Sequence, residues 1–165
     1  IVHKTDAGCV ILDVEDHARL AIAYETITAN AAQANARTPD LVLIECMTTG
    51  VAEMMIGLKR CETFGAIIAV GLGGIWVEVI RDYALRLCPI TIDDAYSMLR
   101  ELRGQVLLEG GRGRLRCDLD AIVEMAVAVG RLGFARADIV ELDLNPVVVM
   151  ESGALAIDVR VVLEQ

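Results

Sequence analysis

Polar side chains alternate with apolar ones along a strand-like segment near the end of the chain. In the run IVELDLNP, Glu141, Asp143 and Asn145 occupy every second position. Side chains alternate across a strand, so these three should share one face. A second apolar segment, 154–163, follows the polar residues 151–153. This pattern predicts a β-hairpin with a short loop.

The hairpin would place Asn145 nearly opposite Asp158. If the loop covers residues 151–153, the two lie within one position of register, and Cβ atoms so placed are roughly 4.5 to 5.5 Å apart. A carboxamide oxygen and a carboxylate at that separation suit Mg²⁺, which prefers oxygen ligands and leaves other positions to water and phosphate. Polar alternation also fits an ordinary solvated face of an edge hairpin, and spacing alone favours this plainer interpretation.

Three further motifs combine residues that could bind a phosphorylated ligand. The GLGG segment at 71–74 would let backbone N–H groups approach an anion, although a tight turn is the simpler explanation. His3, in HKTDAG, can act as a nucleophile toward phosphoryl groups or as a general base, but a lone histidine there is more commonly a surface residue. Glu45, Met47 and Glu53 bracket a strand–loop–strand crossing that could hold adenine and ribose, or form an ordinary hairpin.

The apolar pattern predicts the elements that would position these residues. Short β-branched or alternating segments predict strands at 8–14, 41–46, 52–60, 66–70, 75–80, 82–88, 139–150 and 154–163. Apolar residues spaced three and four apart predict helices at 15–36, after Thr91 and after Asp118, the last two with capping side chains. Successive strands without intervening helices favour an antiparallel sheet, so the expected class is α+β.

Composition limits the classes of function. The 165 residues fit one domain, and the net charge of −9 would repel a nucleic-acid backbone. The longest uncharged apolar run, 63–77, is about 15 residues, which is short for a membrane span. Five scattered cysteines without a CxxC pair indicate a reducing, cytoplasmic protein. Because the chain begins with Ile1 rather than Met, we expect a fragment of a longer polypeptide.

Five segments together resemble the beta (ATP-grasp) part of NDP-forming acyl-CoA synthetases, with succinyl-CoA synthetase as a more distant relative. They are HKTDAG, LIECMTTGVAEMMIGLKRCETFG, VGLGGIWVEVIRD, LLEGGRGR and ELDLNPVVVMESGALAIDVR. The resemblance implies an ATP-grasp C-terminal lobe, a mostly antiparallel sheet with helices packed on one face. It also implies that residues 1–165 are a partial domain without the N-terminal lobe and the CoA-binding domains. The pattern departs from the family at Cys9, usually Gly, and at Cys61-Glu62, usually Asp-Pro.

The resemblance also implies a reaction. Acyl-CoA, phosphate and ADP or GDP would exchange reversibly with a carboxylic acid, CoA and ATP or GTP through a phosphohistidine, with Mg²⁺ as cofactor. Such chemistry depends on positioning and charge neutralisation. A CoA-binding alpha domain or subunit is the implied partner, and the assembly is expected to be a homo-oligomer. The isolated fragment is expected to be inactive. Neither nucleic acid nor a membrane is an expected partner.

Individual roles follow from the family's motifs. His3 would relay the phosphoryl group or bind phosphate, and Asn145 and Asp158 would hold Mg²⁺. Lys4 and Asp143 would contact phosphate or support the metal ligands. The residues that would line the nucleotide site are Glu45, Cys46, Met47, Glu53, Gly73, Gly74 and Glu78.

Two other functions fit parts of the pattern. Similar domains are fused to protein lysine acetyltransferases, where they would sense a ligand without turning it over. The presence of His3, Asn145 and Asp158 favours a working nucleotide site over this sensor. An ATP-grasp ligase that joins a carboxylate to an amine is the third possibility, and the HKTD and GLGG segments argue against it.

Overall fold

The structure is a computed structural model that describes residues 6–34, 41–74, 81–110, 113 and 115–164. The chain divides into two compact units, residues 1–48 and 49–165. The first contains one long helix, α1 (His17–Gln33), close to the bounds that the sequence predicts. It begins where the Asp16 carboxylate accepts a 2.8 Å hydrogen bond from the Arg19 N–H, a capping contact that satisfies an otherwise unpaired helix donor.

The strands predicted at 8–14 and 41–46 are wrong. Both segments form neither helix nor strand. A strand needs a neighbour to pair its backbone N–H and C=O groups, and the described residues of the first unit include no strand. The apolar side chains of Leu12, Leu41 and Leu43 are therefore left exposed.

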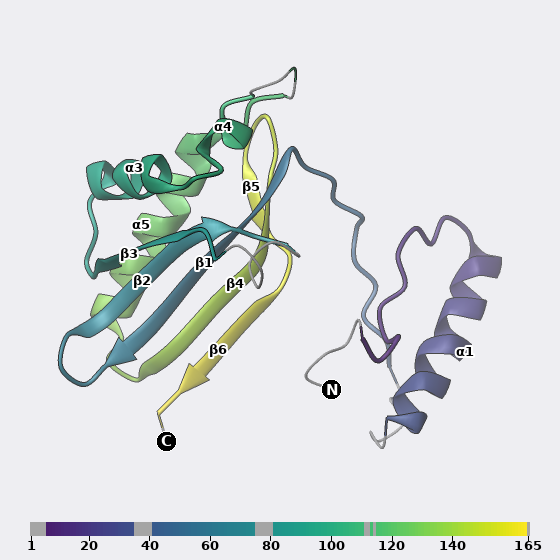
Figure 1. Ribbon diagram of the computed structural model, residues 1–165. Helices are drawn as coiled ribbons and strands as arrows, with labels where there is room; N and C mark the ends of the chain where they lie inside the picture. The colour runs from purple at the N-terminus through teal and green to yellow at the C-terminus, as the bar shows by residue number, and fades with distance from the viewer. Residues whose placement is uncertain (1–5, 35–40, 75–80, 111–112, 114, 165) are drawn as a thin grey trace. The chain divides into compact units, whose positions relative to one another are not determined.

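The second unit is built on one antiparallel sheet (Figure 1). Strands run in the order β3-β2-β1-β4-β5, and β6 also pairs with β4. The predicted antiparallel α+β class is confirmed, and the segment 75–80 lies outside the described residues. The strand bounds are β1 (Ala52–Cys61), β2 (Gly65–Leu72), β3 (Tyr83–Leu87), β4 (Ile139–Val149), β5 (Ala154–Ala156) and β6 (Val159–Leu163).

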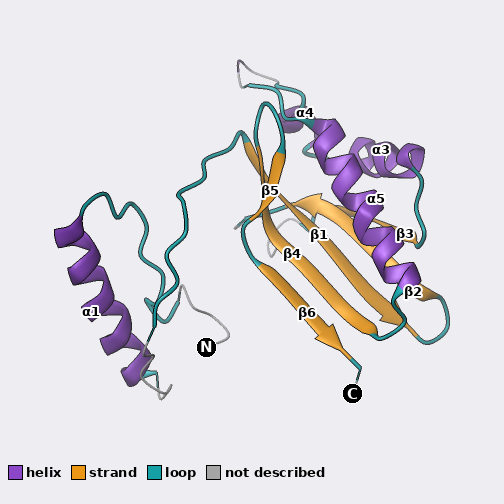
Figure 2. Cartoon of the chain, turned by 180° about the vertical axis from the view of Figure 1, so that it is seen from behind, coloured by secondary structure: helices purple, strands orange, loops and turns teal. Residues whose placement is uncertain are grey.

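The helices of the second unit cover one face of this sheet (Figure 2). They are α3 (Ile92–Glu101), the short α4 (Gln105–Leu108) and α5 (Leu119–Ala135). Thr91 and Asp94 form the predicted capping box at the start of α3, and Asp118 caps α5. No helix in the described part of the chain is long and apolar enough to span a membrane.

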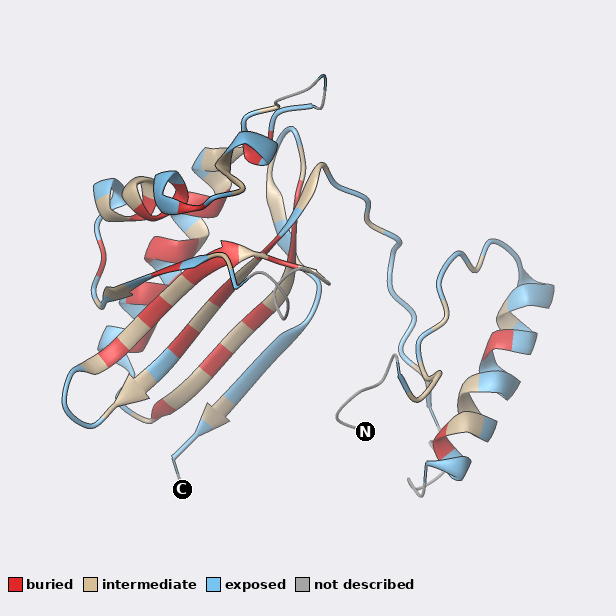
Figure 3. Ribbon diagram, in the orientation of Figure 1, coloured by how far each residue is buried: buried red, intermediate tan, exposed pale blue. Residues whose placement is uncertain are grey.

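Alternation along the strands separates a buried face from an open one (Figure 3). Met54, Ile56 and Leu58 of β1 are at most 2% exposed beneath the helices, and burying a side chain of this size contributes roughly 1.5–3 kcal/mol. Met55 and Gly57, between them, lie on the opposite face. We call the face opposite α3 and α5 the open face. Among its residues on β1 and β4 are Glu53, Met55, Gly57, Lys59, Glu141, Asp143 and Asn145.

Candidate functional site

Asn145 and Asp158 are main-chain partners across the hairpin. The Asn145 N–H donates to the Asp158 carbonyl oxygen over 3.2 Å, and the Ile157 N–H donates to the Pro146 oxygen over 2.9 Å. Opposed residues of an antiparallel pair present their side chains on the same face. Asn145 is partly buried and Asp158 is exposed. The backbone thus sets Asn145 and Asp158 opposite each other on the open face, which agrees with the sequence prediction of a register within one position.

A β-bulge lies at this pair. Met54 pairs with Val147 but Ile56 pairs with Leu144, so Asn145 and Pro146 together face the single residue between them on β1. Proline has no N–H to give to a ladder and occurs in sheets mainly at edges and bulges. The return segment is interrupted here too, so the predicted strand 154–163 divides into β5 and β6.

Sequence reasoning missed this bulge. A bulge re-aims the neighbouring side chains and is common beside functional sites. The signal that could have revealed it was Pro146 in the middle of a strand pattern.

Asp143 lies one row further along the open face. It pairs with Gly57 of β1 and with Arg160 of β6, and a Cβ added at Gly57 would lie 4.0 Å from Asp143 Oδ1. Gly57 and Ala69, which pair across β1 and β2, leave a shallow hollow of about 210 Å³ beside this carboxylate.

The surroundings of Asp143 are acidic. Burial is the largest cause that raises the pKa of its carboxyl group, and the charges of Glu141 and Asp158 raise it further, whereas Arg160 opposes them.

The donor set fits a hard cation. Asn145 and Asp158 offer amide and carboxylate oxygens, the ligand type that Mg²⁺ prefers while it keeps water or phosphate at its other positions. Among the residues that the structure describes, no group of three or more His, Cys, Asp or Glu could hold a metal ion. An amide and a carboxylate oxygen, without thiolate or imidazole beside them in the proposed pair, suit a partly solvated magnesium ion better than a zinc site enclosed by protein ligands.

The GLGG segment packs against Glu53. The Gly73 N–H donates to the Glu53 carbonyl oxygen over 2.8 Å, and a Cβ at Gly73 would lie 2.6 Å from the Met54 oxygen. Gly74 has a φ of +70°, and a Cβ there would lie 2.4 Å from Glu53 Oε2. Gly73 needs glycine because a side chain would collide with the Met54 backbone, and Gly74 needs it because its positive φ disfavours other residues. The structure thus joins Glu53, Gly73 and Gly74 in one group.

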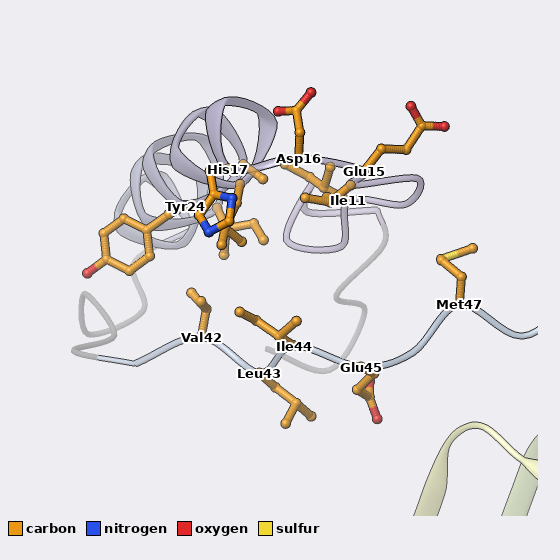
Figure 4. A pocket seen from close by; sticks show the side chains of 14 residues that line it. Ile11, Glu15, Asp16, His17, Tyr24, Val42, Leu43, Ile44, Glu45 and Met47 are labelled. Carbon is orange, nitrogen blue, oxygen red and sulfur yellow. The ribbon is translucent and has the colours of Figure 1, made fainter.

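The predicted adenine-binding segment Glu45–Met47 belongs to the first unit, where all three of its residues are exposed. Glu45 and Met47 help to line an apolar groove of about 280 Å³ beside α1. In Figure 4, Val42 and Ile44 point toward α1, whereas Leu43 points away. His3, Lys4 and Glu78 lie outside the described residues.

Comparison with known proteins identifies the fold to which these residues belong. The family model described as ATP-grasp domain matches residues 1–163. The chain therefore belongs to the ATP-grasp family, which agrees with the antiparallel sheet and its one-sided helical layer.

Within this family, the chain is related to the beta part of ADP-forming acetate–CoA ligases. It is 35% identical over 167 residues to acetate–CoA ligase [ADP-forming] I subunit beta of Pyrococcus furiosus, covering 99% of this chain and 71% of that subunit. It is 36% identical over 163 residues to acetate–CoA ligase [ADP-forming] I of Archaeoglobus fulgidus, covering 99% of this chain but only 24% of that protein. The resemblance seen in the sequence is confirmed.

A solved structure supports the same assignment. The dinucleotide-forming acetyl-coenzyme A synthetase 1 of Ca. Korarchaeum cryptofilum, in complex with coenzyme A and Mg-AMPPCP, has a TM-score of 0.86 and 34% sequence identity. The match covers 99% of this chain and 71% of that chain. These relatives give no support to the acetyltransferase-linked sensor.

Proposed function

We propose that this chain is the nucleotide-binding ATP-grasp part of an ADP-forming acyl-CoA synthetase. The whole enzyme would convert acyl-CoA, ADP and phosphate into a carboxylic acid, CoA and ATP, and the reverse. The observation that carries the proposal is the opposed pair of Asn145 and Asp158 on the open face. The chain spans about a quarter of the single-chain ligase it resembles, so the activity belongs to a larger protein.

The spacing of the two groups on the open face supports this function. Asn145 and Pro146 face Met55 across the bulge, and Glu53 lies two residues from Met55 on β1, which corresponds to roughly 7 Å along a strand. Glu53 would hold the ribose hydroxyls beside the GLGG backbone, while Asn145 and Asp158 would hold Mg²⁺ near the phosphates. Bound Mg²⁺ would neutralise phosphate charge.

Other roles extend this proposal. His3 would carry the phosphoryl group transiently or bind phosphate, and Lys4 and Asp143 would contact phosphate or support the metal ligands. Residues 45–47 would bind adenine, and Glu78 would line the nucleotide site. The Korarchaeum relative was solved with its phosphohistidine segment pointing towards the nucleotide-binding site, which supports transfer through histidine.

We extend the proposal to partners and location. A CoA-binding alpha domain or subunit would complete the enzyme as a homo-oligomer, with phosphate and acyl-CoA as further substrates. The five cysteines are free thiols, which supports a reducing, cytoplasmic location.

The test uses the whole ligase that contains this chain. Asn145→Ala and Asp158→Ala should each reduce ATP formation roughly 100-fold or more and raise the Mg²⁺ concentration needed for half-maximal rate, because a catalytic metal contributes several kcal/mol. Steady-state rates across a Mg²⁺ titration measure both effects.

Asp138→Ala is the matched control. Asp138 is an exposed carboxylate just before β4, paired with Arg136 at 2.6 Å, and its loss should leave the Mg²⁺ dependence unchanged. An unaltered Mg²⁺ dependence in both site variants would reject the metal assignment.

A further inference from the structure

Arg160 lies next to the proposed metal pair on the same face of the sheet. It pairs with Asp143 across β4 and β6 and follows Asp158 by two residues, roughly 7 Å along a strand. A side chain as long as that of arginine can span this separation.

The contacts of Arg160 leave its guanidinium available to a ligand. Its side chain is 69% exposed, and Nη1 lies 3.4 Å from Glu141 Oε1, whose residue is 35% exposed. Surface ion pairs of this kind contribute about 0–1 kcal/mol. A bidentate contact between a guanidinium and a phosphate is stronger, so a phosphate can displace Glu141.

The open face carries several negative charges, so a nucleotide phosphate bound there needs a basic side chain beside it. Glu141, Asp143 and Asp158 gather there, while the phosphates of a nucleotide carry more negative charge than one Mg²⁺ neutralises. Among the described residues of β1, β4 and β6, the basic side chains on this face are Lys59 and Arg160. Lys59 pairs with Glu141, one row further from Asn145, so Arg160 is the nearer of the two.

We propose that Arg160 binds a phosphate group of the Mg²⁺-bound nucleotide, and that Glu141 competes with this phosphate for the guanidinium. The inference rests on the proposed function, because it needs a nucleotide held by Asn145 and Asp158. It adds Arg160 as a residue that contacts the polyphosphate and Glu141 as a residue that weakens the binding of the polyphosphate.

The two partners of the ion pair should have opposite effects on affinity. In the whole ligase, Arg160→Gln should weaken Mg·ATP binding about tenfold, the loss expected for a hydrogen bond to a charged group, and Arg160→Lys should restore part of it. Glu141→Gln should tighten binding about two- to threefold, since it releases Arg160 and removes a negative charge. Calorimetric Kd values and the KM for Mg·ATP measure these changes.

Arg136→Gln is the control, because Arg136 is also an exposed arginine in an ion pair with a carboxylate, Asp138. The Arg136→Gln variant should bind Mg·ATP as the wild type does. If the ion pair of Arg160 is only structural, Arg160→Gln and Glu141→Gln will lower the urea midpoint and leave Mg·ATP affinity unchanged. That result, or a loss of affinity in both variants, overturns the inference.

Failure of the proposed function gives a different pattern. A wild-type ligase that does not bind Mg·ATP, or that keeps its Mg²⁺ dependence in Asn145→Ala and Asp158→Ala, would reject the function and this inference with it. If those variants lose the Mg²⁺ response while Arg160→Gln binds as the wild type does, only the role of Arg160 is wrong.

Discussion

At the scale of single residues, two glycines determine how much space lies on each face of β1. Gly133 of α5 lies over Leu58 on the buried face, and a Cβ there would lie 2.0 Å from Leu58 Cδ1. Gly57, on the open face, leaves the space beside Asp143. The absence of a side chain brings the helix close to β1 in one case and leaves a hollow beside Asp143 in the other.

Gly133→Ala should destabilise the second unit by about 1–3 kcal/mol, because overpacking a filled core forces side chains or backbone to move. Urea unfolding followed by circular dichroism measures the change. Gly130→Ala is the comparison: its Cβ would lie 3.1 Å from Ile90 Cγ1, so its effect should be smaller. An equal or larger effect at Gly130 would contradict the packing argument.

The sequence predicted the register of Asn145 and Asp158 to within one position, because loop length and alternation limit which residues oppose each other in a hairpin. The contact of Gly73 with Glu53 could not be predicted in this way. It joins residues 20 positions apart through the pairing of β1 with β2, which depends on the folded sheet.

At the scale of elements, one side chain joins α5 to the hairpin that carries the candidate site. Asp118 Oδ1 accepts from the Ala121 N–H over 3.1 Å and Oδ2 accepts from the Gly153 N–H over 2.7 Å. The Asp118 N–H also donates to the Met150 oxygen over 2.8 Å. The helix start and both ends of the β4–β5 loop are thereby held together.

This junction should make stability depend on pH. The hydrogen bond from Gly153, followed by that from Ala121, lowers the pKa of Asp118. The ionised carboxylate therefore stabilises the fold fully at pH values above the ordinary aspartate pKa. This stabilisation is lost as the pH falls through the lowered pKa. Asp118→Ala should lower the urea midpoint at pH 7 and make it fall less steeply in acid. Asp118→Asn, which keeps an acceptor but does not titrate, should reduce the acid dependence by the same amount with a smaller loss of stability at pH 7. If Asp118→Ala has the wild-type acid profile, this assignment is wrong.

Helix starts were predictable from sequence because caps are local: Thr91 and Asp118 contact residues three positions away. Strands were less predictable, since a strand forms only beside a partner. Residues 52–60 found partners in β2 and β4, whereas 8–14 and 41–46, which are more apolar, form no strand.

At the scale of the whole molecule, the hydrophobic core belongs to the second unit. Every residue of the buried cluster lies between Met54 and Val149. In the described part of the first unit, Ala23 and Ala31 are the buried hydrophobic residues. Small side chains such as these bury little apolar area, which is the main source of folding free energy.

The two units should therefore differ when they are produced separately. A fragment of residues 49–165 should unfold cooperatively in urea, with near-native helix and strand signals in circular dichroism. A fragment of residues 1–48 should show no cooperative transition. Cooperative unfolding of the shorter fragment would mean that α1 has more packing than its exposed face indicates.

The bond between the Asn145 N–H and the Asp158 oxygen belongs to the main chain, so it survives replacement of either side chain. The ion preference of the proposed site can then change without rebuilding the scaffold, because a carboxylate in place of the amide, or an amide in place of the carboxylate, leaves the hairpin closed. Exchange of these two side chains would therefore be enough to alter which cation the proposed site takes.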